Sequence, residues 1–212
     1  MNPSGETRFV VMVSGNGSNL QALIDAIEKG EVKASIVLVV SSDPEAYALR
    51  RAEKAGIPFI VLRYSRDPKL EKEASRGAYD RMLAETIAPY RPDYIFLLGW
   101  MRVLSAEFTA RFPGRIVNLH PALPGTFPGT HAIERAWEAC ARGEITDSGV
   151  MTHFVPDERV DAGPVIAFER VAIGGTESLD AFEKRMHKTE HLLVVRTAAM
   201  LGSISGESGK GV

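Results

Sequence analysis

Two polar side chains stand at the end of an apolar segment in the middle of the chain. Residues 115–120 read RIVNLH, and the two-residue period of a strand places Asn118 and His120 on the same face. An amide and an imidazolium side by side can donate two hydrogen bonds to one developing oxyanion, as in acyl transfer. A nearby carboxylate would keep the imidazole charged and oriented, and Asp161, in a turn between two later apolar segments, is the candidate. The trio predicts stabilisation of a tetrahedral intermediate.

Two other interpretations of these residues stay open. Asn118 and His120 would also serve as satisfied polar residues that close a strand. A zinc site would need His120, His131, His153 and Asp161 to converge, yet none of them has a short ligand spacing such as HxxxH. His153 alternates with apolar neighbours and is expected in the core or in support of the site. We expect no metal.

A glycine-rich turn follows the first apolar segment. Residues 14–20 read SGNGSNL and lead into an amphipathic helical pattern. Glycines let the backbone approach an anion, and the free amides at a helix N-terminus favour a phosphate, with Ser18 and Asn19 as further donors. A plain strand-to-helix turn with Ser18 as N-cap is the simpler alternative. A dinucleotide site with Asp43 as ribose ligand is the third, although Leu20 stands where its last glycine belongs.

The segments that must position these residues alternate between two patterns. Apolar runs predict seven strands, at residues 8–14, 34–41, 58–63, 93–99, 115–120, 149–155 and 163–173. Helices are predicted at 18–29, 44–55, about 69–88, 105–111, about 130–142 and about 177–201. Together they indicate a doubly wound α/β fold, with a mostly parallel seven-stranded sheet and helices on both faces. Ligands in such folds bind beyond the carboxyl ends of strands, where both motifs lie.

Composition restricts the function to small-molecule chemistry. The net charge of −2, from interspersed residues of both signs, argues against a nucleic-acid partner. No apolar run approaches the roughly 18 residues of a membrane span. A lone Cys140 excludes an intramolecular disulfide and, with no leader pattern at the start, favours the cytoplasm. The small polar ends, residues 1–7 and 203–212, are expected to be flexible tails.

Five motifs together resemble one family. They are GNGSNL at 15–20, GWMRVLS at 99–105, NLHPALPGTFPGTH at 118–131, HFVPDERVDAGPVI at 153–166 and KTEH at 188–191. The resemblance is to the glycinamide ribonucleotide formyltransferases, and it spans nearly the whole chain. NLHP with the later aspartate is shared by all enzymes of the wider family that uses 10-formyltetrahydrofolate, whereas the first and last motifs are typical of the narrower group.

The resemblance implies an enzyme of purine biosynthesis that moves a formyl group from 10-formyltetrahydrofolate, a co-substrate, to glycinamide ribonucleotide. Asn118, His120 and Asp161 would be catalytic. The ribonucleotide would bind Gly15, Asn16, Gly17, Ser18, Asn19 and Glu190, and the folate would bind Met101, Arg102, Val103, Leu104, Val155, Asp157 and Asp161. A single domain over residues 1–212 is implied, with a Rossmann-like mononucleotide half at about 8–104 and a folate-binding, catalytic half at about 105–202. The protein would be a monomer or homodimer.

The chain departs from the family pattern at two places. Members commonly read HPSLLP, whereas Pro124 comes one position early here, and the segment from His153 to Asp161 is one residue longer, with Arg159 where glycine is frequent. Both departures bear on loop shape and folate affinity.

Other functions remain alternatives. Methionyl-tRNA formyltransferase and formyltetrahydrofolate hydrolase would share the trio, but both normally carry an additional domain for which this length leaves no room. An amino-sugar nucleotide formyltransferase also stays open. A nucleotide-sensing module without catalysis would have no need of Asn118, His120 and Asp161 together.

Overall fold

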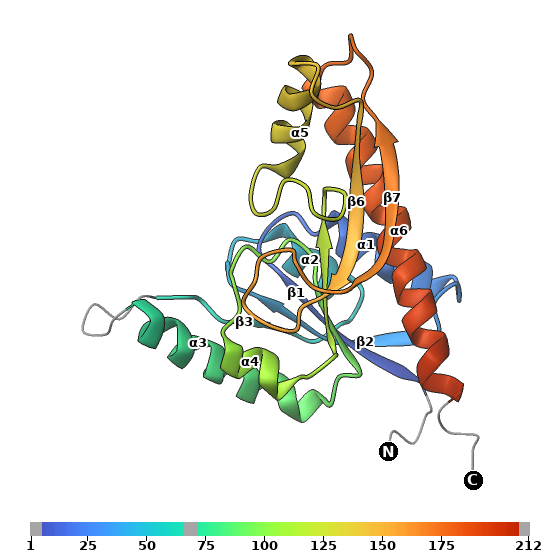
Figure 1. Ribbon diagram of the computed structural model, residues 1–212. Coiled ribbons are helices and arrows are strands. Elements are labelled where there is room, and N and C mark those ends of the chain that lie inside the picture. Colours follow the sequence, from blue (N-terminus) through green and yellow to red (C-terminus); the bar gives the residue numbers. More distant parts are fainter. Residues whose placement is uncertain (1–5, 66–71, 208–212) are drawn as a thin grey trace.

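One seven-stranded sheet organises the chain in the computed structural model, which describes residues 6–65 and 72–207. The strands are β1 (Thr7–Val13), β2 (Ala34–Ser41), β3 (Phe59–Val61), β4 (Tyr94–Leu97), β5 (Ile116–His120), β6 (Asp147–Phe154) and β7 (Val165–Ala172). The helices are α1 (Ser18–Glu28), α2 (Tyr47–Lys54), α3 (Lys72–Ile87), α4 (Ala106–Arg111), α5 (Ala132–Ala141) and α6 (Leu179–Glu207), and a 3₁₀ turn, η1 (Ala88–Tyr90), follows α3. Figure 1 shows their arrangement.

The strand order is β3-β2-β1-β4-β5-β6-β7. Strands β1 to β5 are parallel, whereas β6 is antiparallel to β5 and β7 is antiparallel to β6. The chain therefore winds outward from β1 to β3 and then restarts at β4 on the other side of β1. Such a reversal opens a crevice at the carboxyl ends of β1 and β4, the usual place for a ligand in an open α/β sheet.

Helices cover both faces of the sheet, as the alternating pattern predicts. One apolar core includes Val11 and Val13 of β1 with buried residues of α1, α2, α5 and α6, such as Leu23 and Phe182. The other includes Val10 and Met12 of β1 with residues of α3 and α4. Successive residues of β1 thus enter opposite cores, which explains why this strand is continuously apolar from Phe9 to Val13.

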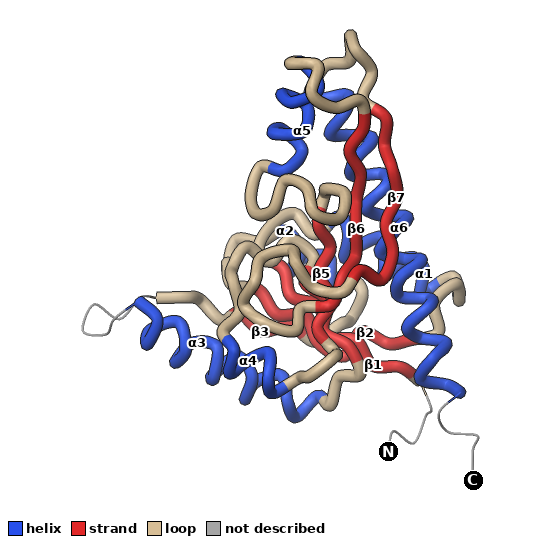
Figure 2. Tube along the Cα trace, in the orientation of Figure 1, coloured by secondary structure: helices blue, strands red, loops and turns tan. Residues whose placement is uncertain are grey.

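The same alternation positions the polar end of β5. Val117 and Leu119 pack in the core under α1 and α6, while Ile116 packs in the core under α3 and α4. The shared face of Ile116, Asn118 and His120 is confirmed, so the last two emerge together toward the loops. Figure 2 shows these loops gathered between α5 on one side and α3 and α4 on the other.

The prediction that residues 1–7 and 203–212 are flexible tails is wrong for part of each range. Thr7 already pairs with Ala34 in the sheet, and its hydroxyl donates to the carbonyl of Gly202 at 3.2 Å. Helix α6 continues to Glu207 instead of ending near residue 201. Residues 1–5 and 208–212, and residues 69–71 of the predicted third helix, lie outside the described residues.

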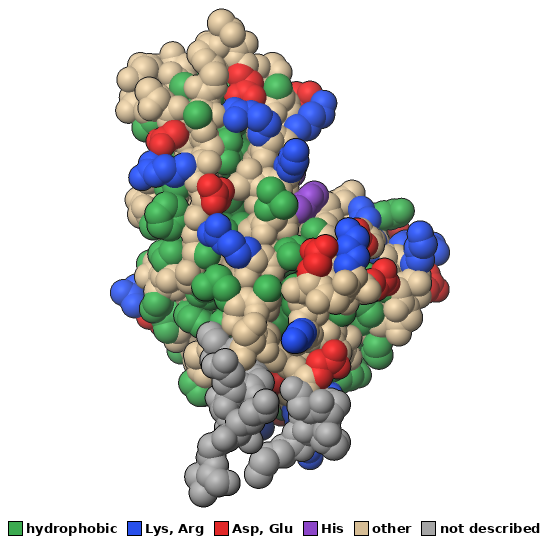
Figure 3. All heavy atoms as spheres, turned by 90° about the vertical axis from the view of Figure 1, so that its right-hand side faces the viewer, with side chains coloured by type: hydrophobic (Ala, Val, Ile, Leu, Met, Phe, Trp, Pro, Cys, Tyr) green, Lys and Arg blue, Asp and Glu red, His purple; other side chains and the backbone are tan. Residues whose placement is uncertain are grey.

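The surface carries charges of both signs. On the face shown in Figure 3, basic and acidic side chains are interspersed with apolar ones. Within the described ranges no helix is both long and apolar enough to cross a bilayer.

Candidate active site

A cavity of about 630 Å³ lies at the carboxyl ends of the central strands. Its wall is formed by the turn after β1, the segment after β4, the end of β5, residues 129–132, the loop after β6 and one face of α6. Every residue that the sequence assigns to a catalytic, ribonucleotide or folate site lines this one cavity: Gly15, Asn16, Gly17, Ser18, Asn19, Met101, Arg102, Val103, Leu104, Asn118, His120, Val155, Asp157, Asp161 and Glu190. Their roles stay predictions, but their convergence is a structural fact.

The three predicted catalytic side chains are in mutual contact. Asn118 Nδ2 donates to Asp161 Oδ1 at 3.0 Å, and His120 Nδ1 lies 3.3 Å from Asp161 Oδ2. The side chains of His120 and Asp161 are both buried, with 5% and 8% of their surface exposed. One carboxylate therefore joins an amide and an imidazole that leave the same strand.

Asp161 contacts His120 and favours its charged form, as expected, but burial acts in the opposite direction. Burial lowers the pKa of His120, and this effect outweighs the opposing charge of Asp161. Spacing along the chain reveals a carboxylate partner but not the depth of burial. His120 Nε2 lies 3.1 Å from the carbonyl oxygen of Phe127, and because a carbonyl only accepts, Nε2 carries the hydrogen of the neutral ring. Nδ1 is turned toward the Asp161 carboxylate, so a proton on this nitrogen completes an ion pair.

Asp161 remains ionised in its buried position. Burial alone would raise the pKa of Asp161, but its contacts with His153, the backbone N–H of Gly129 and His120 hold the pKa below its usual range. The Gly129 N–H donates to Oδ2 at 2.8 Å. Asp161 adopts a left-handed conformation with φ of 50°, which aspartate tolerates better than most residues. This carboxylate thus fastens two loops over the end of β5.

His153 supports the trio, as its alternation in the sequence suggests. Its Nδ1 lies 2.9 Å from the carbonyl oxygen of Phe154, so this nitrogen donates, and its Nε2 lies 3.4 Å from Asp161 Oδ1. Nε2 is 3.2 Å from Asn118 Nδ2. The amide of Asn118 therefore lies within hydrogen-bond distance of both His153 and Asp161. Donation to a substrate oxyanion would draw on this same amide group.

The glycine-rich turn after β1 leads directly into α1. Gly17 is the N-cap residue, with φ of 74°, and no side chain caps the helix. The alternative in which Ser18 caps α1 is therefore wrong, because Ser18 is the first helical residue. The first turn holds no acidic side chain either, so its free N–H groups are available to an anion.

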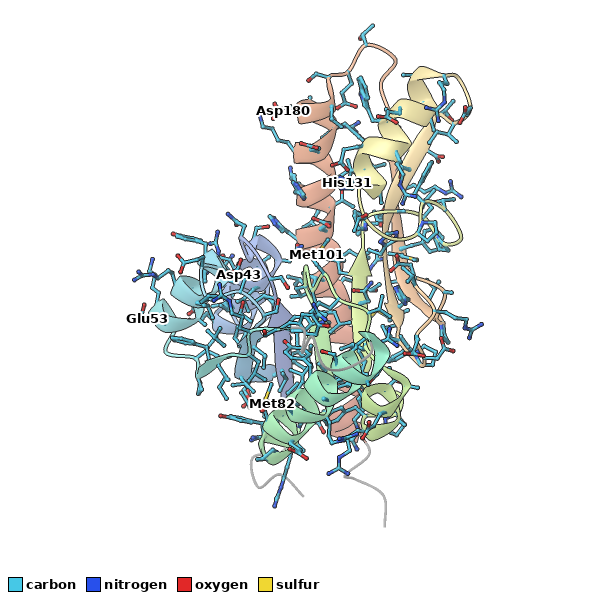
Figure 4. The ribbon with its side chains drawn as sticks, turned by 90° about the vertical axis from the view of Figure 1, so that its left-hand side faces the viewer. Asp43, Glu53, Met82, Met101, His131 and Asp180 are labelled. Carbon is cyan, nitrogen blue, oxygen red and sulfur yellow. The ribbon has the colours of Figure 1, made fainter. Side chains whose placement is uncertain are left out.

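The described residues also show where the side chains of the two competing ligand sites lie. Asp43 does not line the cavity, and its carboxylate accepts from the backbone N–H of Glu45 at 2.9 Å. Figure 4 labels Asp43, which follows β2, and Met101, which follows β4 and does line the cavity. No cluster of three or more histidine, cysteine, aspartate or glutamate side chains suited to a metal is found in residues 6–65 and 72–207.

Glu190 enters the cavity from α6 and brings a histidine with it. It is only 7% exposed, and its Oε2 accepts from His187 Nδ1 at 2.7 Å. The hydrogen bond that His187 donates to Glu190 raises the pKa of His187 above its ordinary value. His187 also lines the cavity, and the sequence analysis missed it. Its spacing of three residues before Glu190 on one helix was the available signal.

The segment after β4 forms the wall that the resemblance assigns to the folate. Leu104 is buried, whereas Met101 is 66% and Val103 is 42% exposed. Trp100, which the sequence analysis did not single out, lines the same wall with a buried indole Nε1 that has no partner among the described residues. An apolar wall in which one N–H donor, that of Trp100, is unused is suited to a heteroaromatic ring that carries hydrogen-bond acceptors.

The two departures from the family pattern have local explanations. Pro124 and Gly125 occupy the centre of a turn that is closed by the Thr126 N–H donating to the Leu123 carbonyl at 3.0 Å, with Gly125 at φ of 78°. Arg159 binds its neighbour, since its Nη2 lies 2.7 Å from Asp157 Oδ2. The carboxylate of Asp157 is therefore engaged within the loop rather than free for a ligand.

Gly17→Ala is expected to lower stability and weaken binding at the turn. A Cβ at this position would lie 2.5 Å from the Cβ of Ala48 on α2, in addition to the left-handed φ. The strained conformation alone costs about 1–3 kcal/mol. Gly30→Ala is the matched control, because Gly30 has φ of 75° but open space around it. Urea unfolding of both variants measures the difference, and equal losses would contradict the close-packing argument.

The fold and the site together define a class of protein. An open, mostly parallel sheet carries an Asn-His-Asp cluster at the junction of an anion-binding turn and an apolar wall, an arrangement suited to transfer of an acyl group between two bound molecules. The family described as formyl transferase matches residues 7–198, and the chain belongs to this family.

Named relatives place the chain more narrowly. It is 44% identical over 196 residues to the phosphoribosylglycinamide formyltransferase of Schizosaccharomyces pombe, covering 89% of this chain and 93% of that protein. It is 40% identical over 185 residues to the Escherichia coli enzyme of the same name, covering 87% of this chain and 82% of that one. The structure of glycinamide ribonucleotide transformylase 1 from Geobacillus kaustophilus matches with a TM-score of 0.83 and 34% identity, over 93% of this chain and 99% of that one.

Proposed function

We propose that this chain transfers a formyl group to the amine of glycinamide ribonucleotide, a step of purine biosynthesis. The observation that carries the proposal is the contact of Asn118, His120 and Asp161 at the point where the anion-binding turn and the apolar wall meet in one cavity. The names of relatives that cover most of this chain support the same acceptor.

The two substrates would occupy opposite ends of the cavity. The phosphate of the ribonucleotide would bind the first-turn N–H groups of α1 and the side chains of Ser18 and Asn19, and Glu190 would accept from the ribose hydroxyls. We propose 10-formyltetrahydrofolate as the formyl donor. Its ring would lie along residues 101–104 and Val155, where the indole N–H of Trp100 offers an unused hydrogen bond.

The reaction is a direct displacement at the formyl carbon. The amine nitrogen forms a bond to this carbon while the carbonyl electron pair moves to oxygen, and the tetrahedral adduct then re-forms the carbonyl and releases the folate nitrogen. One proton passes from the amine to that nitrogen, so no covalent enzyme intermediate is needed. Holding both substrates in one cavity makes the step effectively unimolecular.

The side chains of the trio would divide this work. The Nε2–H of His120 would donate to the oxyanion in place of the Phe127 carbonyl, and Asn118 would add a second donor by releasing one internal bond. Asp161 would hold His120 in place and assist the transfer of the proton from the amine to the folate nitrogen.

The experiment that tests the proposal is a competition between acceptors. The protein is incubated with 10-formyltetrahydrofolate and equal concentrations of glycinamide ribonucleotide and an amino-sugar nucleotide, and the products are identified by mass spectrometry. Only the first should gain a formyl group. Formylation of the sugar nucleotide alone would replace the proposed function with the alternative one.

Glu190→Gln is expected to raise KM for the ribonucleotide about tenfold while kcat changes little, because hydrogen bonds to a charged group are the stronger kind. The substitution also removes the partner that raises the pKa of His187, so His187 should titrate at lower pH in the variant than in the wild type. NMR titration of the imidazole measures this shift. An unchanged His187 titration would contradict the hydrogen bond as its cause.

We further propose that the protein works in the cytoplasm on small molecules, as a monomer or homodimer. Cys140, the only cysteine in the sequence, is a free thiol, which suits a reducing compartment.

A further inference from the structure

We propose that Arg51, on α2, is a positioning residue for the ribonucleotide phosphate: it occupies the acceptor groups of Asn16, so that the turn after β1 presents hydrogen-bond donors to the anion. The inference rests on the function proposed above. Arg51 does not line the cavity, so its effect would pass through the turn rather than through contact with substrate.

Three hydrogen bonds from one guanidinium hold the turn and α1 together. Arg51 Nε donates to the backbone carbonyl of Asn16 at 3.0 Å, and its Nη2 donates to Asn16 Oδ1 at 3.0 Å. Its Nη1 donates to Gln21 Oε1 at 3.2 Å. The planar fork of arginine fits both oxygens of Asn16 at once, which a lysine ammonium cannot do with the same geometry.

These contacts determine which atoms of the turn face a ligand. With Oδ1 turned to the guanidinium, the Nδ2 group of Asn16 is on the opposite side of the amide, and Asn16 lines the cavity. A free carbonyl oxygen next to a phosphate would repel it, whereas an N–H group attracts it. The guanidinium also brings a permanent positive charge to the outside of the turn. By occupying these acceptors, Arg51 leaves mainly hydrogen-bond donors of the turn after β1 facing the anion.

The position of Arg51 is itself fixed by packing. Helix α2 begins against the turn, where the N–H of Ala48 donates to the carbonyl of Gly15 at 3.2 Å and Gly17 leaves no room for a side chain beside Ala48. The guanidinium lies 4.8 Å from the ring centre of Tyr47, within cation–π range. In Figure 1, α2 lies close to α1, which carries Gln21. The arginine is therefore held at the place where the turn needs it.

The adjacent Arg50 provides a matched control. It carries the same charge on the same helix, but its side chain is 78% exposed and forms an ion pair with Glu53 at 3.8 Å, away from the turn. Because this exposed pair has little energetic effect, Arg50→Gln removes one positive charge from α2 without disturbing the turn.

The experiment compares Arg51→Gln, Arg51→Lys and Arg50→Gln by calorimetric titration with glycinamide ribonucleotide and by steady-state kinetics. Both Arg51 variants should bind the ribonucleotide about tenfold more weakly and raise its KM to match, as expected for lost charge-assisted hydrogen bonds. Their kcat and their KM for 10-formyltetrahydrofolate should stay within about twofold of wild type, because the catalytic trio is untouched. Arg50→Gln should behave as wild type.

Three outcomes would overturn the inference alone. Full recovery of ribonucleotide binding in Arg51→Lys would show that charge without geometry suffices. A loss of kcat with equal increases in the KM values for both substrates would indicate that Arg51 only supports the fold. An unchanged KM for the ribonucleotide would indicate that Arg51 has no role in its binding. If Arg51→Gln does not fold, Arg51→Lys decides by the same criteria. A wild-type protein that neither binds nor formylates glycinamide ribonucleotide would instead overturn the proposed function, and this inference with it.

Discussion

His120→Ala is expected to lower kcat by about 1000-fold or more. Loss of one oxyanion donor costs about 100- to 1000-fold, and loss of a general acid–base adds to this. The substitution removes the ring whose Nε2–H the oxyanion would receive and whose Nδ1 faces Asp161 at 3.3 Å. Ribonucleotide binding should be nearly intact, because the glycine-rich turn and Glu190 belong to other elements. Single-turnover kinetics with calorimetric titration measures both quantities.

His120→Asn serves as the control for packing. Its shorter amide fills part of the space and can still contact Asp161, but it lacks the imidazole nitrogens that donate and carry a proton. We therefore expect its kcat to stay close to that of His120→Ala while its thermal stability stays closer to wild type. A kcat near the wild-type value in either variant would count decisively against His120 as a catalytic residue.

Asp161→Asn is expected to lower kcat by about 100- to 1000-fold, through loss of the charge that supports a protonated His120. Asparagine tolerates the left-handed backbone of residue 161, so the change does not add backbone strain. Its NH₂ group must nevertheless face a donor in either orientation, the Gly129 N–H on one side or Asn118 Nδ2 on the other. The loop from residue 155 to 161 should therefore also lose stability.

The pH dependence of unfolding tests the same residue independently. Since the folded protein holds the pKa of Asp161 below the ordinary value of 3.8, the ionised carboxylate stabilises the fold at all higher pH values. That contribution is lost as the pH falls below 3.8 and through the folded pKa. The difference in unfolding free energy between wild type and Asp161→Asn should be constant near neutral pH and shrink in acid. A difference that grew in acid would contradict the assignment.

Much of the fold could be predicted from local pattern. The two-residue period of a strand predicts alternating faces for residues 115–120, and the two cores do divide Ile116 from Val117 and Leu119. The C-terminal limit of α6 could not be predicted in the same way, because the last turns of the helix are formed mostly by polar residues and glycines. Contacts from elsewhere in the chain, such as the Thr7 hydroxyl on the Gly202 carbonyl, support that part of the helix.

The site could be predicted where its residues belong to one continuous motif, and less well where contacts join residues far apart in the sequence. Asn118 and His120 are two residues apart, so their common face follows from strand geometry. The contact of Arg51 with Asn16 joins residues 35 positions apart, and no periodicity connects them. The net direction of the His120 pKa shift could not be predicted for a similar reason, because burial by the whole fold lowers this pKa more than Asp161 raises it.

The most direct test of the account is whether release of tetrahydrofolate depends on the amine acceptor. The protein is mixed with 10-formyltetrahydrofolate, and release is followed with and without glycinamide ribonucleotide. We expect one equivalent of tetrahydrofolate for each equivalent of formylated ribonucleotide, and negligible release when the acceptor is omitted. Release at the same rate without the acceptor would mean that water takes the formyl group, and it would contradict a transferase in which Asn118, His120 and Asp161 act on two bound substrates.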